Sequence, residues 1–234
     1  MTQDRQAGRA QVREERADAR RTRRAGPETP LSREGIVRTA LALVDREGLP
    51  ALSMRRLGAE LGVDPMAIYY HVPNKEALFD AIVEAVMAEI DLTRDDPSAP
   101  AEDRIMWAAR AYRDVMLAHA NALPIVLSRG PSTPEAMRPV ELLIGILRDA
   151  GLPPDRAMAG MNAIAATVRG IVGMAENGSE PPSAEEMRAM GEQFPAEEFP
   201  YLREATICAS NFFEADFEFG IRALARGLIE SAEQ

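Results

Sequence analysis

Four closely spaced helix starts between residues 31 and 78 constrain the fold of this chain more than any other feature. Each start combines an apolar residue, a residue that can cap a helix, and a second apolar residue five positions after the first. The capping oxygen satisfies free backbone amides, and the two apolar residues pack together and fix how the chain enters the helix. A small, sharply folded helical unit is therefore expected. The four sets are Leu31-Ser32 with Ile36, Leu52-Ser53 with Leu57, Val63-Asp64 with Ile68, and Pro73-Asn74 with Leu78.

The middle two helices of this unit are joined by a very short turn. The second helix stops at Gly62, and Pro65 is well placed at the first position of the third, where its missing N–H would have had no partner. Two short helices joined so tightly have the geometry of a helix-turn-helix. The predicted helices are 33–47, 54–61 and 65–71, followed by a longer one at 75–91.

The remainder of the chain also predicts helices. Apolar residues make up 46% of the sequence, helix formers such as Ala, Leu, Arg and Glu dominate, and no stretch indicates a strand. Pro139 lies where a helix is expected, so that helix starts there or kinks. Residues 178–200 hold many prolines and acids and indicate a mobile loop or a short broken helix. Further helices are predicted at 102–120, 124–129, 136–150, 154–177, 201–212 and 214–231.

Charge is distributed unevenly along the chain. The net charge is -10, but residues 1–75 carry 14 basic and 10 acidic side chains, and residues 76–234 carry 13 and 27. A positive module attached to an acidic body is typical of a DNA-binding protein with a second, non-DNA-binding half, although chance variation would also produce it. The arginine-rich segment 1–30 cannot build a core. It is either a basic arm that contacts DNA or a solvated tail.

The expected domains are the basic arm at 1–30, a helix-turn-helix domain at 31–75, a connecting helix and linker at 76–100, and an effector-binding and dimerisation domain at 101–234. The fold class is all-α: a three-helix DNA-binding domain and a larger helical C-terminal domain.

Several other classes of protein are disfavoured. Cys208 is the single cysteine, so an intramolecular disulfide framework and a cysteine-rich metal site are excluded. The two histidines are far apart, and metal-ligand spacing and a phosphate-binding glycine loop are missing, which argues against an enzyme and against a bound metal or cofactor. The sequence shows neither a signal peptide nor a membrane span. We expect a cytoplasmic protein without membrane contact.

The third helix carries the candidate DNA-reading residues. Ile68 and Val72 face inward, which leaves Met66, Ala67, Tyr69, Tyr70 and His71 for the major groove. Arg55 lies in the first turn of the second helix, where the helix dipole disfavours cations, so an anion such as phosphate is a plausible partner. Lys75 begins the fourth helix, where free amides and an ammonium together attract anions, although an ordinary surface charge is equally consistent.

The run from Ser53 to Leu78 closely resembles the DNA-binding motif of the TetR family of transcriptional regulators, most specifically in its ending Tyr69-Tyr70-His71-Val72-Pro73-Asn74-Lys75. The resemblance implies an all-helical homodimer that represses transcription until a small molecule binds its C-terminal domain. It also implies DNA contact by the residues that match the family motif. These are Arg55, Tyr69, Tyr70, His71 and Lys75.

In the C-terminal half, the run Phe199-Pro200-Tyr201-Leu202-Arg203-Glu204-Ala205 and the final helix more faintly resemble the tetracycline-repressor subclass. Val126 stands where tetracycline-sensing members place a magnesium-binding histidine, which argues against tetracycline sensing. Small residues in the helix at 154–177, with the last helix around Phe217, Ile221, Leu224 and Leu228, suit a four-helix dimer interface. The candidate ligand-binding residues could equally be plain core. They are Trp107, Tyr112, Met116, His119, Met161 and Met174.

The predicted function is that of a sequence-specific DNA-binding regulator. We expect a repressor that leaves its palindromic operator when a small apolar or amphipathic ligand binds the C-terminal domain. The alternatives are a ligand-independent architectural DNA-binding protein and a transcriptional activator.

Overall fold

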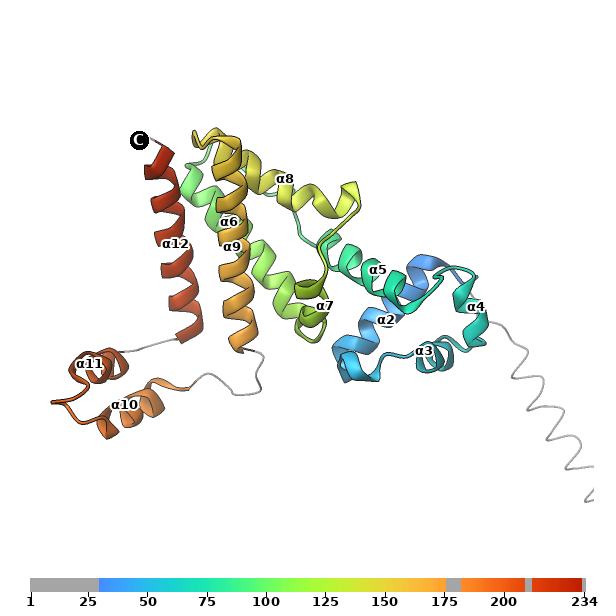
Figure 1. Ribbon diagram of the computed structural model, residues 1–234, viewed down its shortest axis with the longest axis horizontal. Coiled ribbons are helices and arrows are strands. Elements are labelled where there is room, and N and C mark those ends of the chain that lie inside the picture. Colours follow the sequence, from blue (N-terminus) through green and yellow to red (C-terminus); the bar gives the residue numbers. More distant parts are fainter. Residues whose placement is uncertain (1–29, 176–181, 209–211, 233–234) are drawn as a thin grey trace, which may run out of the picture. The chain divides into compact units, whose positions relative to one another are not determined.

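The computed structural model describes residues 30–175, 182–208 and 212–232 (Figure 1). Within these ranges the regular elements are helices, without strands, which confirms the predicted all-α fold. The contacts divide into two compact units, one ending at Ile82 and the other beginning at Val83. This division falls inside a helix, later than the predicted end of the DNA-binding domain at residue 75. The predicted basic arm, apart from Pro30, lies outside the described residues.

The first unit is built from short helices with formed caps. Ser53 Oγ accepts a hydrogen bond from the backbone amide three residues later at 3.1 Å. Asp64 Oδ1 accepts one from the Met66 amide at 2.8 Å. Gly62 ends its helix in the left-handed conformation with φ 67°, which suits a residue without a side chain. The elements are α2 (Arg33–Glu47), the 3-10 helix η1 (Leu49–Ala51), α3 (Met54–Leu61), α4 (Pro65–Tyr69) and the start of α5 (Lys75–Ala88).

The core of this unit contains the second apolar residue of each predicted helix start. Ile36, Leu57, Ile68 and Leu78 are all 0% exposed. The turn between α3 and α4 is closed by a hydrogen bond from the Val63 amide to the Gly58 carbonyl at 2.9 Å. The three-helix arrangement predicted from the sequence is therefore present, with α3 at its predicted bounds.

The second unit is a helical bundle. Helix α6 contacts α8, α9 and α12, and α9 also contacts α8 and α12 (Figure 1). Helices α10 and α11 pack on each other. The elements that follow α5 are α6 (Ala101–Ala118), the 3-10 helix η2 (Ala120–Ala122), α7 (Leu123–Ser128), α8 (Pro134–Asp149), α9 (Pro154–Ala175), α10 (Ala184–Gln193), α11 (Pro200–Cys208) and α12 (Phe212–Ala232).

Two helices of this unit differ from the prediction. Helix α8 begins at Pro134 and contains Pro139, so of the two alternatives for this proline, a helix start at Pro139 is wrong. Thr133 supplies the N-cap and Pro134 occupies the first turn, which outweighs the one backbone hydrogen bond that Pro139 removes. Helix α10 lies in the segment predicted as a loop or short broken helix. It is held by a capping box between Ser183 and Glu186.

Candidate DNA-binding surface and ligand cavity

Helix α4, which ends at Tyr69, and the turn that follows it present large side chains to solvent. Tyr70 is 89% exposed and Met66 64%, and Tyr69 and His71 are also exposed, whereas Ala67 is half-buried. On the opposite side Ile68 and Val72 are buried in the core of the unit. A helix that exposes aromatic side chains while its other face is fixed in a core has the geometry needed to enter a groove of DNA.

The two arginines at the start of α3 have different environments. Arg56 pairs with the Glu47 carboxylate at 2.8 Å and lies 3.8 Å from the Glu60 carboxylate. Arg55 is exposed and has no ion-pair partner within the described part of the chain. The charge of Arg56 is thus compensated inside the protein, and that of Arg55 is available to a phosphate.

Lys75 is exposed at the first position of α5. Its Nζ atom lies 5.2 Å from the centre of the Phe79 ring, which limits the directions in which this flexible side chain points. The Asn74 side chain caps the helix by accepting a hydrogen bond from the Ala77 amide at 2.8 Å. An ammonium held at a helix start provides a favourable place for a phosphate group.

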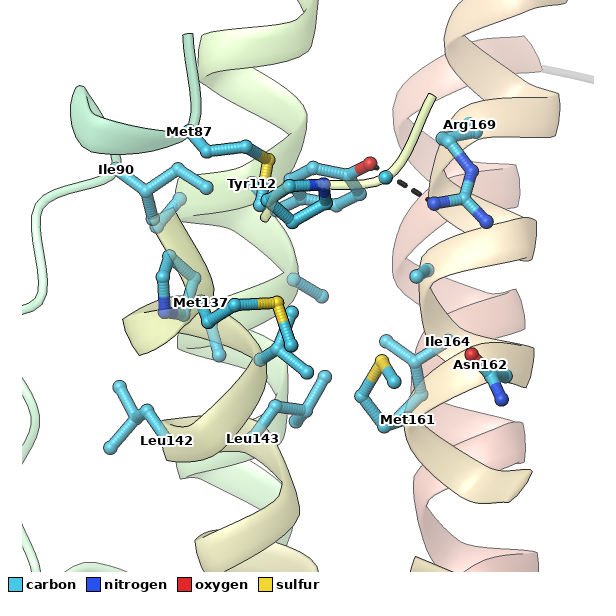
Figure 2. A pocket seen from close by; sticks show the side chains of 18 of the residues that line it. Met87, Ile90, Tyr112, Met137, Leu142, Leu143, Met161, Asn162, Ile164 and Arg169 are labelled. Carbon is cyan, nitrogen blue, oxygen red and sulfur yellow. Dashed lines mark hydrogen bonds between the residues drawn. The ribbon is translucent and has the colours of Figure 1, made fainter. Parts of the chain in front are cut away.

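The second unit contains a cavity of about 360 Å³, a size that suits a small organic ligand (Figure 2). Its wall is formed mainly by apolar residues of α6, α8 and α9, with contributions from the end of α5 and the segment after α7. Three of the six residues predicted to bind a ligand line it: Trp107, Tyr112 and Met161.

The other three predicted ligand residues are not part of this wall. Met116 is buried elsewhere in the core, with 1% of its surface exposed. His119 follows α6, and its Nε2 atom lies 2.8 Å from a Glu89 carboxylate oxygen. Met174 is 56% exposed near the end of α9. Composition pointed to α6 and α9, which both line the cavity, but it missed α8 and could not identify which helix faces meet the cavity.

Three polar residues of the wall were missed by the sequence analysis. Arg129, Asn162 and Arg169 all line the cavity. The Arg169 guanidinium donates a long hydrogen bond of 3.4 Å to the Tyr112 hydroxyl oxygen. One signal in the sequence could have indicated Arg169: acidic residues are absent from the positions three and four residues before and after it on α9.

A carboxylate on α5 anchors the segment that follows the cavity-lining residues Gly130 and Pro131. Glu84 accepts hydrogen bonds from the Ser132 amide at 2.7 Å and from the Ser132 hydroxyl at 3.0 Å. It also accepts hydrogen bonds from the amide and the hydroxyl of Thr133. Burial opposes ionisation of Glu84, but these hydrogen bonds outweigh it and hold the pKa of the carboxyl below its ordinary value.

The positions of potential metal-ligand side chains are defined only in the described part of the chain. No cluster of three or more His, Cys, Asp or Glu side chains able to hold a metal ion occurs there. Val126, at the position where the resemblance would require a histidine, is a buried residue of the cavity wall.

Comparison with known proteins identifies the family. A model of "Bacterial regulatory proteins, tetR family" matches residues 36–82, and a model of the "Tetracyclin repressor-like, C-terminal domain" matches residues 96–231. The class A tetracycline repressor of transposon 1721 from Escherichia coli is 30% identical over 203 residues, which cover 86% of this chain and 91% of that repressor.

Solved structures agree in fold along the chain. Apo ActR from Streptomyces coelicolor superposes with a TM-score of 0.77 at 29% identity, covering 88% of this chain and 98% of that one. ActR in complex with actinorhodin gives a TM-score of 0.76 at 29% identity, covering 88% and 100%. These matches, and the C-terminal model that spans more than half of the sequence, show that the chain belongs to the TetR family: it is a DNA-binding transcriptional regulator and not an enzyme.

Proposed function

We propose that this protein is a cytoplasmic, homodimeric repressor that binds a palindromic operator and leaves it when a small apolar or amphipathic molecule occupies the cavity of the second unit. The observation that carries the proposal is the cavity of about 360 Å³, walled largely by apolar side chains, in a chain whose other unit exposes a helix-turn-helix. An architectural DNA-binding protein has no need of such a cavity.

Operator reading is assigned to α4 and its flanking cations. The exposed side chains Met66, Tyr69, Tyr70 and His71, with Ala67 beside them, would meet base edges and sugar-phosphate oxygens. Arg55 and Lys75 would contact phosphates on either side.

The ligand site is assigned to the cavity rather than to the full set of residues selected from the sequence. Trp107, Tyr112 and Met161 are retained as ligand contacts because they line the wall. ActR, a relative with the same fold, has been solved with actinorhodin bound. The tetracycline repressors among the relatives are named after a different ligand, so family membership alone does not identify the ligand of this protein.

Homodimer formation is supported by apolar surface on two neighbouring helices. Helix α9 is long and apolar enough to span a membrane by length and composition, yet it packs in the bundle with a third of its apolar stretch buried. Ala159, Ala166 and Gly170 are exposed on α9, and Phe219 is 78% exposed on α12. Small residues on α9 would let a second copy approach closely.

The α12 residues expected from the sequence to form the interface are only partly accessible. Leu224 and Leu228 are half-buried. Phe217 and Ile221 are 0% exposed and belong to the core of the subunit. They pack inside the bundle, so the surface available to a partner is the one that carries Phe219.

The decisive experiment selects bound duplexes from a random DNA pool with the full chain and measures affinity for the enriched sequence. A palindrome bound by two copies is expected. Tyr70→Ala should weaken binding, whereas Tyr201→Ala, which removes an equally exposed tyrosine from α11, should not. Replacing Lys75 by alanine should reduce the salt slope by about one unit. Failure to enrich a palindrome, or equal binding by all these variants, would refute the assignment.

Dimer formation is tested separately by sedimentation equilibrium. Ala166→Glu places a charge on the exposed face of α9 and should yield monomers, because a buried unpaired carboxylate is strongly unfavourable. Ala42→Glu, at an exposed position of α2, is the matched control and should leave the dimer intact. A dimer that survives Ala166→Glu would place the interface elsewhere.

A further inference from the structure

Arg169 is a half-buried cation on the cavity wall that has no carboxylate partner within the described part of the chain. Acidic side chains are plentiful in this part of the sequence, because residues 76–234 contain 27 acidic and 13 basic side chains. Several other arginines of the bundle are paired with carboxylates. Arg104 binds Asp95 at 2.8 Å, and Arg110 binds Glu218 at 2.6 Å.

The position of Arg169 on α9 directs its charge toward the cavity. Figure 2 shows its guanidinium reaching toward the Tyr112 hydroxyl, to which it donates the hydrogen bond of 3.4 Å. Because Tyr112 uses its oxygen to accept this bond, its own O–H remains able to donate to a ligand. The other arginine of the wall, Arg129, already has an interaction partner in the chain.

The charge balance of the wall favours an anion. Asp and Glu are missing among the residues described as lining the cavity. A cation taken partly out of water is unfavourable until an opposite charge or strong acceptor joins it. A guanidinium also offers several N–H donors in one plane, which match the two oxygens of a carboxylate or similar group.

The rest of the wall favours an aromatic body. Trp107 and Tyr112 contribute rings, and Met87, Met137 and Met161 contribute sulfur atoms on flexible side chains. Methionine sulfur makes favourable contacts with aromatic rings, and its flexible side chain adapts to flat ligands. The labelled methionines approach the cavity from α5, α8 and α9 (Figure 2).

We propose that the effector of this regulator is an aromatic anion, whose charged group pairs with Arg169 and accepts a hydrogen bond from Tyr112 while its rings lie among the methionines and Trp107. The inference rests on the proposed function, because it names the chemical class of ligand for that same cavity. It assigns Arg169 as the residue that discriminates a charged ligand from its neutral analogue.

The test compares two fluorescent probes with the same ring system. Anilinonaphthalene sulfonate is an aromatic anion, and phenylnaphthylamine is its analogue without the sulfonate. Trp107 is the one tryptophan of the sequence and lines the cavity, so energy transfer from its fluorescence to either probe reports binding near this site. A purely apolar cavity would prefer the neutral probe, because removing a sulfonate from water is unfavourable.

In the full-length protein we expect the anion to bind more tightly than the neutral probe. Arg169→Met, which keeps the apolar stem and removes the charge, should weaken binding of the anion roughly 10- to 100-fold, as expected for loss of a charge-assisted hydrogen bond. It should leave the neutral probe nearly unaffected. Arg169→Lys should restore part of the preference, and Tyr112→Phe should weaken the anion alone.

The matched control is Arg156→Met, the same substitution at an exposed position of α9 outside the cavity wall. It should bind both probes as the unchanged protein does. Equal affinity of the unchanged protein for both probes, no binding of the anion, or an equal loss of both probes in Arg169→Met would each overturn the proposal. The proposed function is tested without probes, by operator binding, so the two can fail independently.

Discussion

Replacing Gly58 by alanine is expected to strain the turn of the helix-turn-helix. A Cβ atom at this position would lie 2.9 Å from the Val63 carbonyl oxygen and 3.2 Å from the ring and nitrogen of Pro65. These are mainly backbone atoms of the turn, so relief requires movement of the chain that leads into α4. The need for glycine here comes from close approach and not from backbone conformation, because Gly58 is an ordinary helical residue.

Two opposing effects determine the size of the change. Overpacking of this kind typically costs about 1–3 kcal/mol. Alanine is about 1 kcal/mol more favourable than glycine inside a helix, which offsets part of that cost. Gly145→Ala isolates the second effect, since Gly145 lies in helix α8 and an added Cβ would meet open space. The difference between the two variants should therefore equal the steric cost, about 1–3 kcal/mol.

Amide hydrogen exchange of the full chain measures both local effects. The Val63 amide, hydrogen-bonded to the Gly58 carbonyl at 2.9 Å, should exchange faster in Gly58→Ala, while the amides around Gly145 should exchange more slowly in the control. Operator affinity should fall in Gly58→Ala as α4 moves. If the amides around residue 58 exchange more slowly in Gly58→Ala, as those around residue 145 do in the control, the close-approach argument is wrong.

Two further changes test the second unit. Glu84→Gln should loosen the segment at Ser132 and Thr133. Hydrogen bonds lower the pKa of Glu84 in the folded protein. The Glu84 carboxylate therefore stabilises the fold fully at pH values above its ordinary pKa of about 4.5, and this contribution is lost as the pH falls through the lower pKa of the folded state. Melting temperatures of the variant and the unchanged protein should thus differ at neutral pH and converge in acid, and a pH-independent difference would contradict this account. Arg104→Met leaves the Asp95 carboxylate, whose side chain is 12% exposed, without its two hydrogen bonds of 2.8 and 2.9 Å. It should destabilise the unit by about 3–5 kcal/mol in denaturant unfolding, with most of the loss recovered when Asp95→Asn is added. If Arg104→Met and the double variant were equally stable, loss of the Arg104–Asp95 ion pair would be excluded as the cause of the destabilisation.

Local signals predicted the first unit well. Ser53 and Gly62 set the ends of α3, and Asp64 and Pro65 set the start of α4, because caps act on neighbouring backbone groups and are visible in the sequence. The same kind of signal was available but not used for α10, where Ser183 and Glu186 stand at the spacing of a capping box.

The cavity could not be predicted in the same way. Met116 and Tyr112 belong to one helix, yet only Tyr112 lines the wall, since the face that meets the cavity depends on how α8 and α9 pack against α6. Helices α8 and α9 lie outside the α6 segment of the sequence, so the pattern of apolar residues within α6 carries no information about how they pack against it. Arg169 was overlooked for this reason, although its lack of acidic neighbours along α9 was visible.

The start of α5 has a practical consequence for labelling. Lys75 is the one lysine in the sequence, and it is exposed beside the candidate DNA-reading helix. An amine-directed reagent therefore has one side-chain target in this protein, besides the α-amine. Bound operator should shield that target, so the extent of acylation at a single residue would report occupancy of the DNA surface.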